Sequence, residues 1–551
     1  MDIQIKWGVR IPMRDGVELS ADVYLPKAEG RYPAIISRTP YLKTTDITIE
    51  NSKFYASKGY AVIVVDTRGR GDSEGEFVPY RNEGVDGYDT IEWAAEQPWC
   101  DGNVGTMGGS YLGRIQWLAA LEQPPHLKAM ISVVSPSDPF VEWPTGIPTP
   151  HHLCWLFLTS GRTMQNMHKI EWNAIYDHLP LLTMDELTGR EMPYWREELE
   201  HQGLDEWWKN ICYQDKFEQI DLPVLHVSGW YDDEQVGTPL NFHGMSTRAA
   251  SVGARRSQKM IMGPWGHAVN ASTKVGDVDF GPDSLIDIRG AYVRFFDRWL
   301  KGIDNGLDQE PNARIFVMGE NKWRDEHEWP LARTQWTPYY IHSGGQANSR
   351  FGDGVLSTEQ PGAEAPTDSY SYDPSRPFPF ITDGTSSQIG GPDDYAALER
   401  RDDVLVYSTP VLTEDVEVTG PVKMELYAAS SAVDTDFMVK LLDVHPNGFV
   451  QRLTDGMVRA RFREGMEPEN MSLIEPGKVY QYEVDCWNIS HLFQSGHQIR
   501  IEIASAAFPK YDRNLNTGAP LGHTSDYVVA EQTIFHDAAH PSAIILPVIP
   551  R

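Results

Sequence analysis

Short, continuous runs of apolar residues alternate with helix-like segments through the first third of the chain. Residues 34–37 (AIIS) and 60–66 (YAVIVVD) are typical of strands that are buried on both faces of a mainly parallel sheet. The pattern between and after them predicts helices over residues 46–58, 88–97 and 114–121 and a further strand over residues 127–134. This alternation predicts an open α/β sheet, which binds ligands at the carboxyl ends of its strands.

The pattern changes between residues 136 and 219. This segment is rich in Trp, Met and His, shows no strand alternation and includes a helix-like run over residues 184–200. It predicts a helical cap inserted into the α/β domain. The sheet resumes with apolar runs at residues 222–229 and 259–263, and a helix over residues 291–300 is expected to close the domain.

Beyond about residue 310 the helical signal nearly vanishes. Alternating patterns typical of sandwich strands follow, over residues 416–429, 436–444, 479–484 and 498–505. A chain of 551 residues also exceeds what one hydrophobic core usually organises. We therefore predict an α/β catalytic domain over residues 1–135 and 220–310, a helical cap over 136–219, and a β domain with its connecting linker over 311–551.

Charge and composition exclude some classes of function. The formal net charge of −30 argues against nucleic acid as a partner, because phosphates need a basic footprint. No apolar run approaches the roughly 20 residues of a membrane span, and the N-terminus lacks the pattern of a signal peptide. The four cysteines are widely spaced and form no metal-like cluster. We expect a cytoplasmic protein with reduced, structural cysteines.

One serine stands between glycines just ahead of a helix-like run. In residues 105–113 (GTMGGSYLG), Gly108 and Ser110 fit a nucleophile elbow, a strained strand-to-helix turn that needs small neighbours. The second glycine of the usual G-x-S-x-G pentapeptide arrives one position late, at Gly113. Because a glycine-serine cluster is also typical of a flexible turn, the assignment depends on an acid and a base elsewhere.

Both partners follow in the order that an α/β hydrolase requires, acid first and histidine second. Asp232 is the first acidic residue after the predicted strand at 224–227, and His267 follows the strand at 259–262. His267 would act as general base toward Ser110, and Asp232 would orient its imidazole. Three other carboxylates compete for the acid's role: Asp233, Glu234 and, more distantly, Asp138.

Stabilisation of a developing oxyanion needs two hydrogen-bond donors. The backbone N–H of Tyr111, directly after the candidate nucleophile, is the first. The loop after the strand at 34–37 has no glycine run to supply a second backbone donor, so the hydroxyl of Tyr41 is the second candidate.

Five blocks, in order, resemble the cocaine esterase and X-prolyl dipeptidyl peptidase family of serine hydrolases (CocE/NonD type). They are RTPY (38–41), DTRGRGDS (66–73), GGSYLG (108–113), GWYD (229–232) and GPWGH (263–267). The family pattern carries the late glycine. The resemblance implies an α/β-hydrolase fold with a jelly-roll C-terminal domain. It also implies Ser110, Asp232 and His267 as the triad, with Tyr41 and Tyr111 as the oxyanion hole. The block around Arg68 and Asp72 is expected to support the site by ion pairing.

The substrate is less constrained. Family members that hydrolyse α-amino acid esters bind the substrate ammonium with a cluster of carboxylates. Glu234 matches one of these, but Gln235 stands where another is expected, and the cap member has no secure match. Without the cluster, an uncharged acyl group would lie among apolar side chains, for which Trp143, Trp155, Trp230 and Tyr231 are candidates.

We therefore predict a serine hydrolase that cleaves carboxylic esters through an acyl-enzyme, with no metal or cofactor. The alternative is an amide or peptide hydrolase. X-prolyl dipeptidyl peptidases typically carry a long N-terminal helical domain, whereas this chain enters the predicted catalytic sheet almost at once, which weakens the peptidase interpretation. A non-catalytic carbohydrate-binding or scaffold protein is the third class. The expected partner is a small-molecule ester or amide, with neither nucleic acid nor membrane involved. The sequence is compatible with a homo-oligomer, and it leaves the acyl and leaving groups open.

Overall fold

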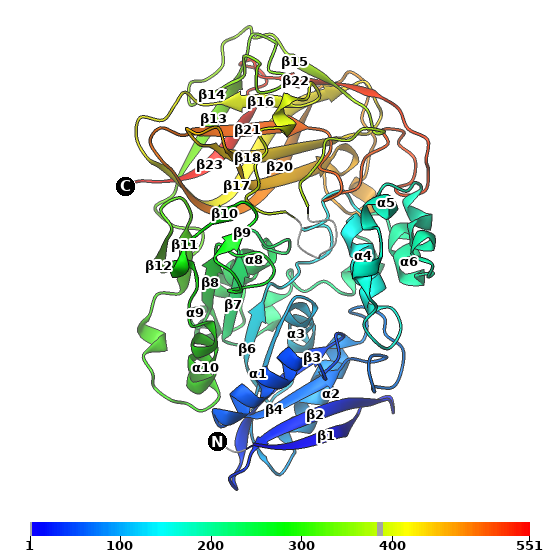
Figure 1. Cartoon of the computed structure of the whole chain (residues 1–551), viewed down its shortest axis with the longest axis vertical. Coiled ribbons are helices and arrows are strands. Elements are labelled where there is room, and N and C mark those ends of the chain that lie inside the picture. The colour runs from blue at the N-terminus through cyan, green and yellow to red at the C-terminus, as the bar shows by residue number, and fades with distance from the viewer. Residues whose placement is uncertain (1–2, 383–389) are drawn as a thin grey trace.

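The structure, a computed structural model, describes residues 3–382 and 390–551 and consists of three parts (Figure 1). Residues 1–2 and 383–389, which fall in the predicted catalytic and β domains, lie outside the described residues. An α/β part occupies the lower half of the view, a β domain the upper half, and a helical segment lies beside both.

A ten-stranded sheet forms the centre of the α/β part. Its strands from β4 to β11 are parallel, while β1, β2 and β12 are antiparallel to their neighbours. In spatial order they are β1 (Ile3–Pro12), β2 (Glu18–Pro26), β4 (Ala61–Asp66), β3 (Tyr32–Thr39), β5 (Cys100–Gly109), β6 (Leu127–Val133), β7 (Val224–Gly229), β8 (Lys259–Gly263), β11 (Ala313–Val317) and β12 (Lys322–Glu326).

Helices cover both faces of this sheet, which explains its continuous apolar strands. Successive residues point to opposite faces, so that Ile35 packs in one core and Ile36 in the other. The core of Ile35 includes helices α1 (Asp46–Ser57) and α10 (Ile288–Trp299). The core of Ile36 includes α2 (Glu83–Ala95), α3 (Tyr111–Leu121), α8 (Gly237–Arg248) and α9 (Val252–Arg256).

The segment between β6 and β7 is helical, as predicted, but its helices are short. The run expected over residues 184–200 is not one helix. It forms a 3₁₀ segment (Leu181–Thr188) and α6 (Pro193–Glu200), because Gly189 between them adopts a left-handed conformation and Pro193 starts a new helix. The other helices are α4 (Pro150–Thr159), α5 (Trp172–Tyr176) and α7 (Glu206–Lys209). This segment packs against the β domain through Phe462 and Leu521.

The catalytic sheet extends further along the chain than predicted. Strand β11 pairs in parallel with β8, and β12 pairs with β11, although both lie beyond residue 310. A small hairpin of β9 (Lys274–Val275) and β10 (Val278–Asp279) precedes α10. The boundary predicted at residue 310 is therefore too early, because β11 and β12 belong to the catalytic sheet and not to the β domain.

The C-terminal part is a largely antiparallel β domain of eleven strands. Its longest pairing joins β17 (Val416–Ser430) and β20 (Tyr480–Phe493). The other strands are β13 (Gln335–His342), β14 (Val355–Ser357), β15 (Asp368–Tyr372), β16 (Leu405–Ser408), β18 (Asp436–Val444), β19 (Val450–Arg459), β21 (Gln498–Ala504), β22 (Ala530–Phe535) and β23 (Ala543–Ile549). The strand predicted over 479–484 is the first half of β20.

The observed architecture confirms the expected fold class, an α/β hydrolase with a helical insertion and a C-terminal β domain. All four cysteines are buried, and none forms a disulfide. Among the described residues, no helix combines the length and the apolar character that a membrane crossing requires.

Candidate active site

Ser110 lies at the sharp turn between β5 and α3, at the carboxyl edge of the sheet. Its backbone has φ 59° and ψ −130°, a positive-φ conformation that is rare for a residue with a side chain. Its N–H donates to the carbonyl oxygen of Val133 at 3.0 Å. A Cβ at Gly113 would lie 2.8 Å from the same carbonyl oxygen. The late glycine therefore lets α3 pass closely over the end of β6.

Asp232 and His267 follow the ends of β7 and β8. Nδ1 of His267 lies 2.8 Å from Oδ1 of Asp232, and the Ser228 hydroxyl donates to the other carboxylate oxygen at 2.6 Å. The Asp232 side chain is fully buried. The structure thus brings an acid and a histidine into the hydrogen-bonded arrangement that orients a general base.

The competing acids are less well placed. The Asp233 carboxylate lies 3.3 Å from Nδ1 of His267 and that of Glu234 lies 4.0 Å away, and both are partly exposed. Asp138 accepts the backbone N–H groups of Tyr213 and Gln214, each at 2.9 Å, which gives its carboxylate a structural role. The geometry therefore favours Asp232 as the orienting acid.

Several carboxylates change the proton affinity of His267. Burial opposes its charged form, but the negative charges of Asp233, Glu234 and Asp232 outweigh this effect and raise the pKa of His267 well above its ordinary value. Burial raises the pKa of Glu142 to about 8 and, with the neighbouring carboxylates, raises that of Glu234 well above its usual range. The acidic groups of the site therefore raise one another's pKa values and that of His267.

The hydroxyl of Tyr41 is held by the helical segment. The indole N–H of Trp155 donates to the Tyr41 oxygen at 2.8 Å. Tyr41 and Ser110 line the same cavity. Since the indole proton occupies one acceptor position on the oxygen, the hydroxyl proton of Tyr41 is left to point toward the reacting position.

Arg70 joins the loop of Tyr41 to the end of helix α4. Its Nε donates to the carbonyl oxygen of Pro40 at 2.8 Å, and its Nη1 donates to the carbonyl oxygens of Thr159, at 2.5 Å, and Gly161. The guanidinium is fully buried. It therefore fixes Tyr41 and the helix that carries Trp155 relative to each other.

The block around Arg68 and Asp72 forms the ion pairs that were expected. Lys43 pairs with Asp66 at 2.9 Å and with Asp72 at 3.1 Å, and Arg68 pairs with Asp86 at 2.6 Å. The Lys43 pairs tie the loop after β3 to the end of β4 and the segment that follows it, and the Arg68 pair ties that segment to α2.

Tyr111 is the first residue of α3, so its backbone N–H belongs to the helix turn that has no intrahelical acceptor. Its buried side chain donates a hydrogen bond to Glu83 at 2.7 Å, and Glu83 pairs with Arg38 at 2.7 Å. The ring stacks against Trp155 at a centroid distance of 5.5 Å. Tyr111 is thus held rigidly at the start of the helix.

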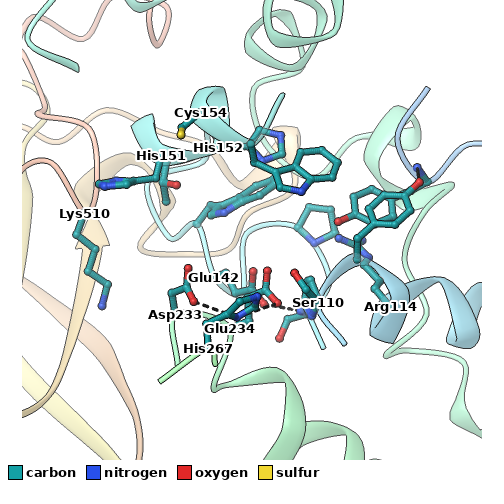
Figure 2. A pocket seen from close by; sticks show the side chains of 18 of the residues that line it. Ser110, Arg114, Glu142, His151, His152, Cys154, Asp233, Glu234, His267 and Lys510 are labelled. Carbon is teal, nitrogen blue, oxygen red and sulfur yellow. Dashed lines mark hydrogen bonds and ion pairs between the residues drawn. The ribbon is translucent and has the colours of Figure 1, made fainter. Parts of the chain in front are cut away.

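These groups line a cavity of about 330 Å³, here called the central cavity, where all three parts of the chain meet. Of the predicted site residues, the cavity walls include Ser110, His267, Tyr41, Tyr111, Trp143, Trp155 and Glu234. Figure 2 shows the side chains nearest Ser110 on one side of the cavity, and those of helix α4 opposite: Glu142, Asp233, Glu234 and His267 against His151, His152 and Cys154.

Trp230 and Tyr231 do not reach the central cavity. Both are buried in the core that joins the sheet to the β domain, where the Trp230 indole donates to the carbonyl oxygen of Phe316 at 2.7 Å. Gln451 donates to the Tyr231 hydroxyl at 3.1 Å. Their position after β7 turns them toward the β domain, so the prediction that they line the pocket does not match the structure.

Sequence reasoning missed several wall residues. Glu142 comes from the helical segment, and Trp487, Lys510 and Tyr511 come from the β domain. Lys510 is buried and pairs with Asp455 at 2.5 Å. Only the acidic character of Glu142, close to the predicted cap boundary, offered a signal in the sequence.

Two groups of side chains among the described residues are close enough to share a metal ion: Asp232, Asp233 and His267, and, in the β domain, Asp443, His445 and His497. In the first group the imidazole nitrogen already faces carboxylate oxygen at hydrogen-bonding distance. That a metal is not required stays a prediction.

Comparison with known proteins gives matches over most of the chain. Residues 15–269 match the family described as X-Pro dipeptidyl-peptidase (S15 family), and residues 305–545 match its C-terminal non-catalytic domain. Cocaine esterase of Rhodococcus sp. (strain MB1 Bresler) is 38% identical, with 98% of each chain covered.

Two solved structures have closely similar folds. An aminopeptidase from a marine sediment archaeon (Thaumarchaeota archaeon) superposes with a TM-score of 0.86 at 25% identity, covering 100% of this chain and 97% of the other. An α-amino acid ester hydrolase superposes with a TM-score of 0.86 at 24% identity, covering 99% and 97%.

Proposed function

The chain belongs to the cocaine esterase and X-prolyl dipeptidyl peptidase family of serine hydrolases, and on that premise we propose how it cleaves carboxylic esters. Ser110 is the nucleophile, His267 the general base, and Asp232 the carboxylate that orients the imidazole. The observation that carries this assignment is the 2.8 Å contact between His267 and Asp232, beside a serine in elbow geometry on the same cavity.

The reaction follows from these positions. Nδ1 of His267 faces Asp232, so Nε2 takes the proton of the Ser110 hydroxyl as its oxygen attacks the ester carbonyl. The oxyanion that forms accepts hydrogen bonds from the Tyr41 hydroxyl and the Tyr111 N–H. His267 then protonates the departing alcohol, and a water molecule activated by the same nitrogen releases the acyl group from Ser110.

Replacement of Tyr41 by phenylalanine is expected to lower kcat roughly 10²- to 10³-fold, because the oxyanion loses one of its two donors. The change removes only the hydroxyl, so the KM for p-nitrophenyl acetate is expected to change little. Steady-state kinetics measure both values. Tyr32→Phe, which removes a hydroxyl far from the site, is the matched control. An unchanged kcat in Tyr41→Phe would remove Tyr41 from the mechanism.

The central cavity also suggests the class of substrate. Glu142, Asp233 and Glu234 line it together, and Oε2 of Glu234 is buried without a hydrogen bond from any residue that the structure describes. Nδ1 of His267 lies 4.0 Å from this oxygen but is hydrogen-bonded to Asp232. A buried carboxylate oxygen that accepts no hydrogen bond and lies beside further carboxylates gains free energy when a cation binds. We therefore propose that the preferred esters carry a basic nitrogen. This proposal differs from the expectation from the sequence, in which Gln235 interrupts the carboxylate cluster and an uncharged acyl group is favoured.

Glu234→Gln is expected to reduce kcat/KM for a cationic ester roughly 10- to 100-fold and to leave its neutral isostere nearly unchanged, as for loss of one charged hydrogen bond. Phenylalanine ethyl ester against ethyl 3-phenylpropanoate tests the acyl side. 2-(Dimethylamino)ethyl acetate against 3-methylbutyl acetate tests the alcohol side. Exposed Glu218→Gln is the control. Equal losses for the cationic and neutral members of both pairs would contradict ammonium recognition.

The amide alternative is tested with the same acyl group. Hydrolysis of phenylalanine p-nitroanilide is expected to be much slower than that of the ethyl ester. A comparable kcat/KM for the two substrates would favour a peptidase, the activity named for part of the family.

A further inference from the structure

A second cavity, of about 530 Å³, lies over the sheet between α1 and α10, and we refer to it as the α1–α10 cavity. Among the described residues, Ser110 and His267 are the two that line both this cavity and the central cavity. The two spaces therefore meet at the reactive serine and histidine. Aliphatic side chains from the sheet and from both helices form much of the lining: Ile35, Ile47, Val62, Val64, Val133 and Ile288.

The α1–α10 cavity has a different chemistry from the central cavity. No Asp or Glu is among its described lining residues, whereas Glu142, Asp233 and Glu234 line the central one. Its one Arg or Lys is Arg289, whose guanidinium lies 5.5 Å from the centre of the Phe54 ring on α1. Away from the shared serine and histidine, its other polar side chains are uncharged and include Ser37, Thr48, Asn51 and Ser52. A cation therefore gains little here, whereas a hydrocarbon group gains free energy by leaving water for the aliphatic walls.

Helix α10 packs unevenly on the sheet, which explains the space. Near its C-terminal end it is very close, since a Cβ at Gly105 would lie 2.8 Å from the Phe296 ring. Near its N-terminal end, Ile288 and Tyr292 line the cavity instead of filling it. The cavity is partly open to solvent, since Ile47 on its α1 wall is exposed and Thr48 and Asn51 are partly exposed. An apolar group that enters it leaves water.

We propose that the α1–α10 cavity binds a hydrocarbon portion of the ester substrate. This inference rests on the proposed function: the ester carbonyl sits at Ser110, its polar portion lies in the central cavity, and an alkyl or aryl group extends between α1 and α10. The enzyme then selects amphiphilic esters, because each side of the carbonyl meets a cavity of different polarity.

Chain-length series test the proposal and show which half of the ester enters. One series varies the acyl chain of p-nitrophenyl esters from acetate to octanoate, and the other varies the alcohol of n-alkyl acetates from ethyl to octyl. In one series kcat/KM is expected to rise roughly threefold to fourfold per methylene until the cavity is filled. Flat profiles in both series would overturn the proposal.

Substitutions on α1 locate the effect. Asn51 and Thr48 both line the α1–α10 cavity and are partly exposed, so a larger side chain can replace either. Asn51→Trp is expected to reduce the octanoate-to-acetate ratio of kcat/KM, or the corresponding ratio for the alcohol series, at least tenfold. Thr48→Trp is the second filling variant. Glu50→Trp, on the exposed face of the same helix, is expected to keep the wild-type ratio.

The outcomes separate this proposal from the proposed function. If wild-type enzyme turns over p-nitrophenyl acetate and Ser110→Ala does not, but neither filling variant changes the chain-length ratio, the cavity proposal fails alone. If Ser110→Ala retains acetate turnover, the proposed function fails. Melting temperatures within a few degrees of wild type establish that the tryptophan variants are folded, so that an unchanged ratio in them counts against the proposal.

Discussion

Ser110→Ala is expected to lower kcat for p-nitrophenyl acetate by roughly 10⁵- to 10⁶-fold, the largest effect of any single substitution in this chain. Alanine removes the oxygen that attacks the carbonyl, while Tyr41, Tyr111 and the cavity walls remain. The residual rate then reflects binding and oxyanion stabilisation alone. The same substitution is expected to abolish covalent labelling by a fluorophosphonate, which intact-protein mass spectrometry detects as an added mass on the wild-type chain.

The elbow backbone makes the matched control important, because Ser110 holds a positive φ that alanine tolerates poorly. A melting temperature close to wild type shows that the loss is chemical. Exposed Ser272→Ala is expected to keep both kcat and labelling. If Ser110→Ala is folded and still labelled, a different residue is the nucleophile.

Asp232→Asn is expected to lower kcat roughly 10⁴-fold, because the amide favours the wrong tautomer of His267 and no longer stabilises the imidazolium. The Asp233 carboxylate, at 3.3 Å from the same nitrogen, makes the comparison informative. Asp233→Asn is expected to retain most of the activity at its pH optimum. A larger loss in Asp233→Asn than in Asp232→Asn would transfer the acid's role to Asp233.

The pH dependence of kcat/KM independently measures how strongly Asp233 acts on His267. General-base catalysis needs neutral His267, so kcat/KM rises as pH increases through the pKa of this residue in the free enzyme. That pKa is raised by the surrounding carboxylates, so the rising limb is expected above the ordinary value for histidine. Removal of one negative charge in Asp233→Asn lowers the pKa and moves the limb to lower pH. A limb that stays in place would show that Asp233 does not act on His267.

Strands β3, β4, β6, β7 and β8 were predictable because they are almost entirely buried and mainly apolar. No range was predicted for β5, since its glycine-rich sequence is only partly buried and has no continuous apolar run. Strands β1 and β2 were not predicted. Strand β1 lies at the sheet edge and alternates between exposed and partly buried residues, so it has no continuous apolar run. The helix expected over residues 184–200 failed at a left-handed Gly189, where local backbone preference outweighed the helical pattern.

The part of the candidate site that lies at strand ends could be predicted, because short sequence patterns mark those positions. The candidates Ser110, Asp232 and His267 lie just beyond the carboxyl ends of β5, β7 and β8, so the topology brings them to one edge of the sheet. Glu142 and Lys510 reach the cavity only through the packing of the insertion and the β domain, which no local pattern encodes. For the same reason, Trp230 and Tyr231 were placed near the right strand end but on the wrong side of it.

The buried guanidinium of Arg70 has a consequence for evolution and engineering. Through Pro40 and Thr159 it couples the loop that carries an oxyanion donor to the helix that forms the substrate wall. Exchange of the whole insertion between relatives is therefore expected to displace the oxyanion donor Tyr41, and so to lower kcat, as well as to change the selectivity. We expect new specificities to be reached more readily by changing side chains within the existing insertion than by transplanting it, because Trp155 of the insertion contacts both Tyr41 and Tyr111.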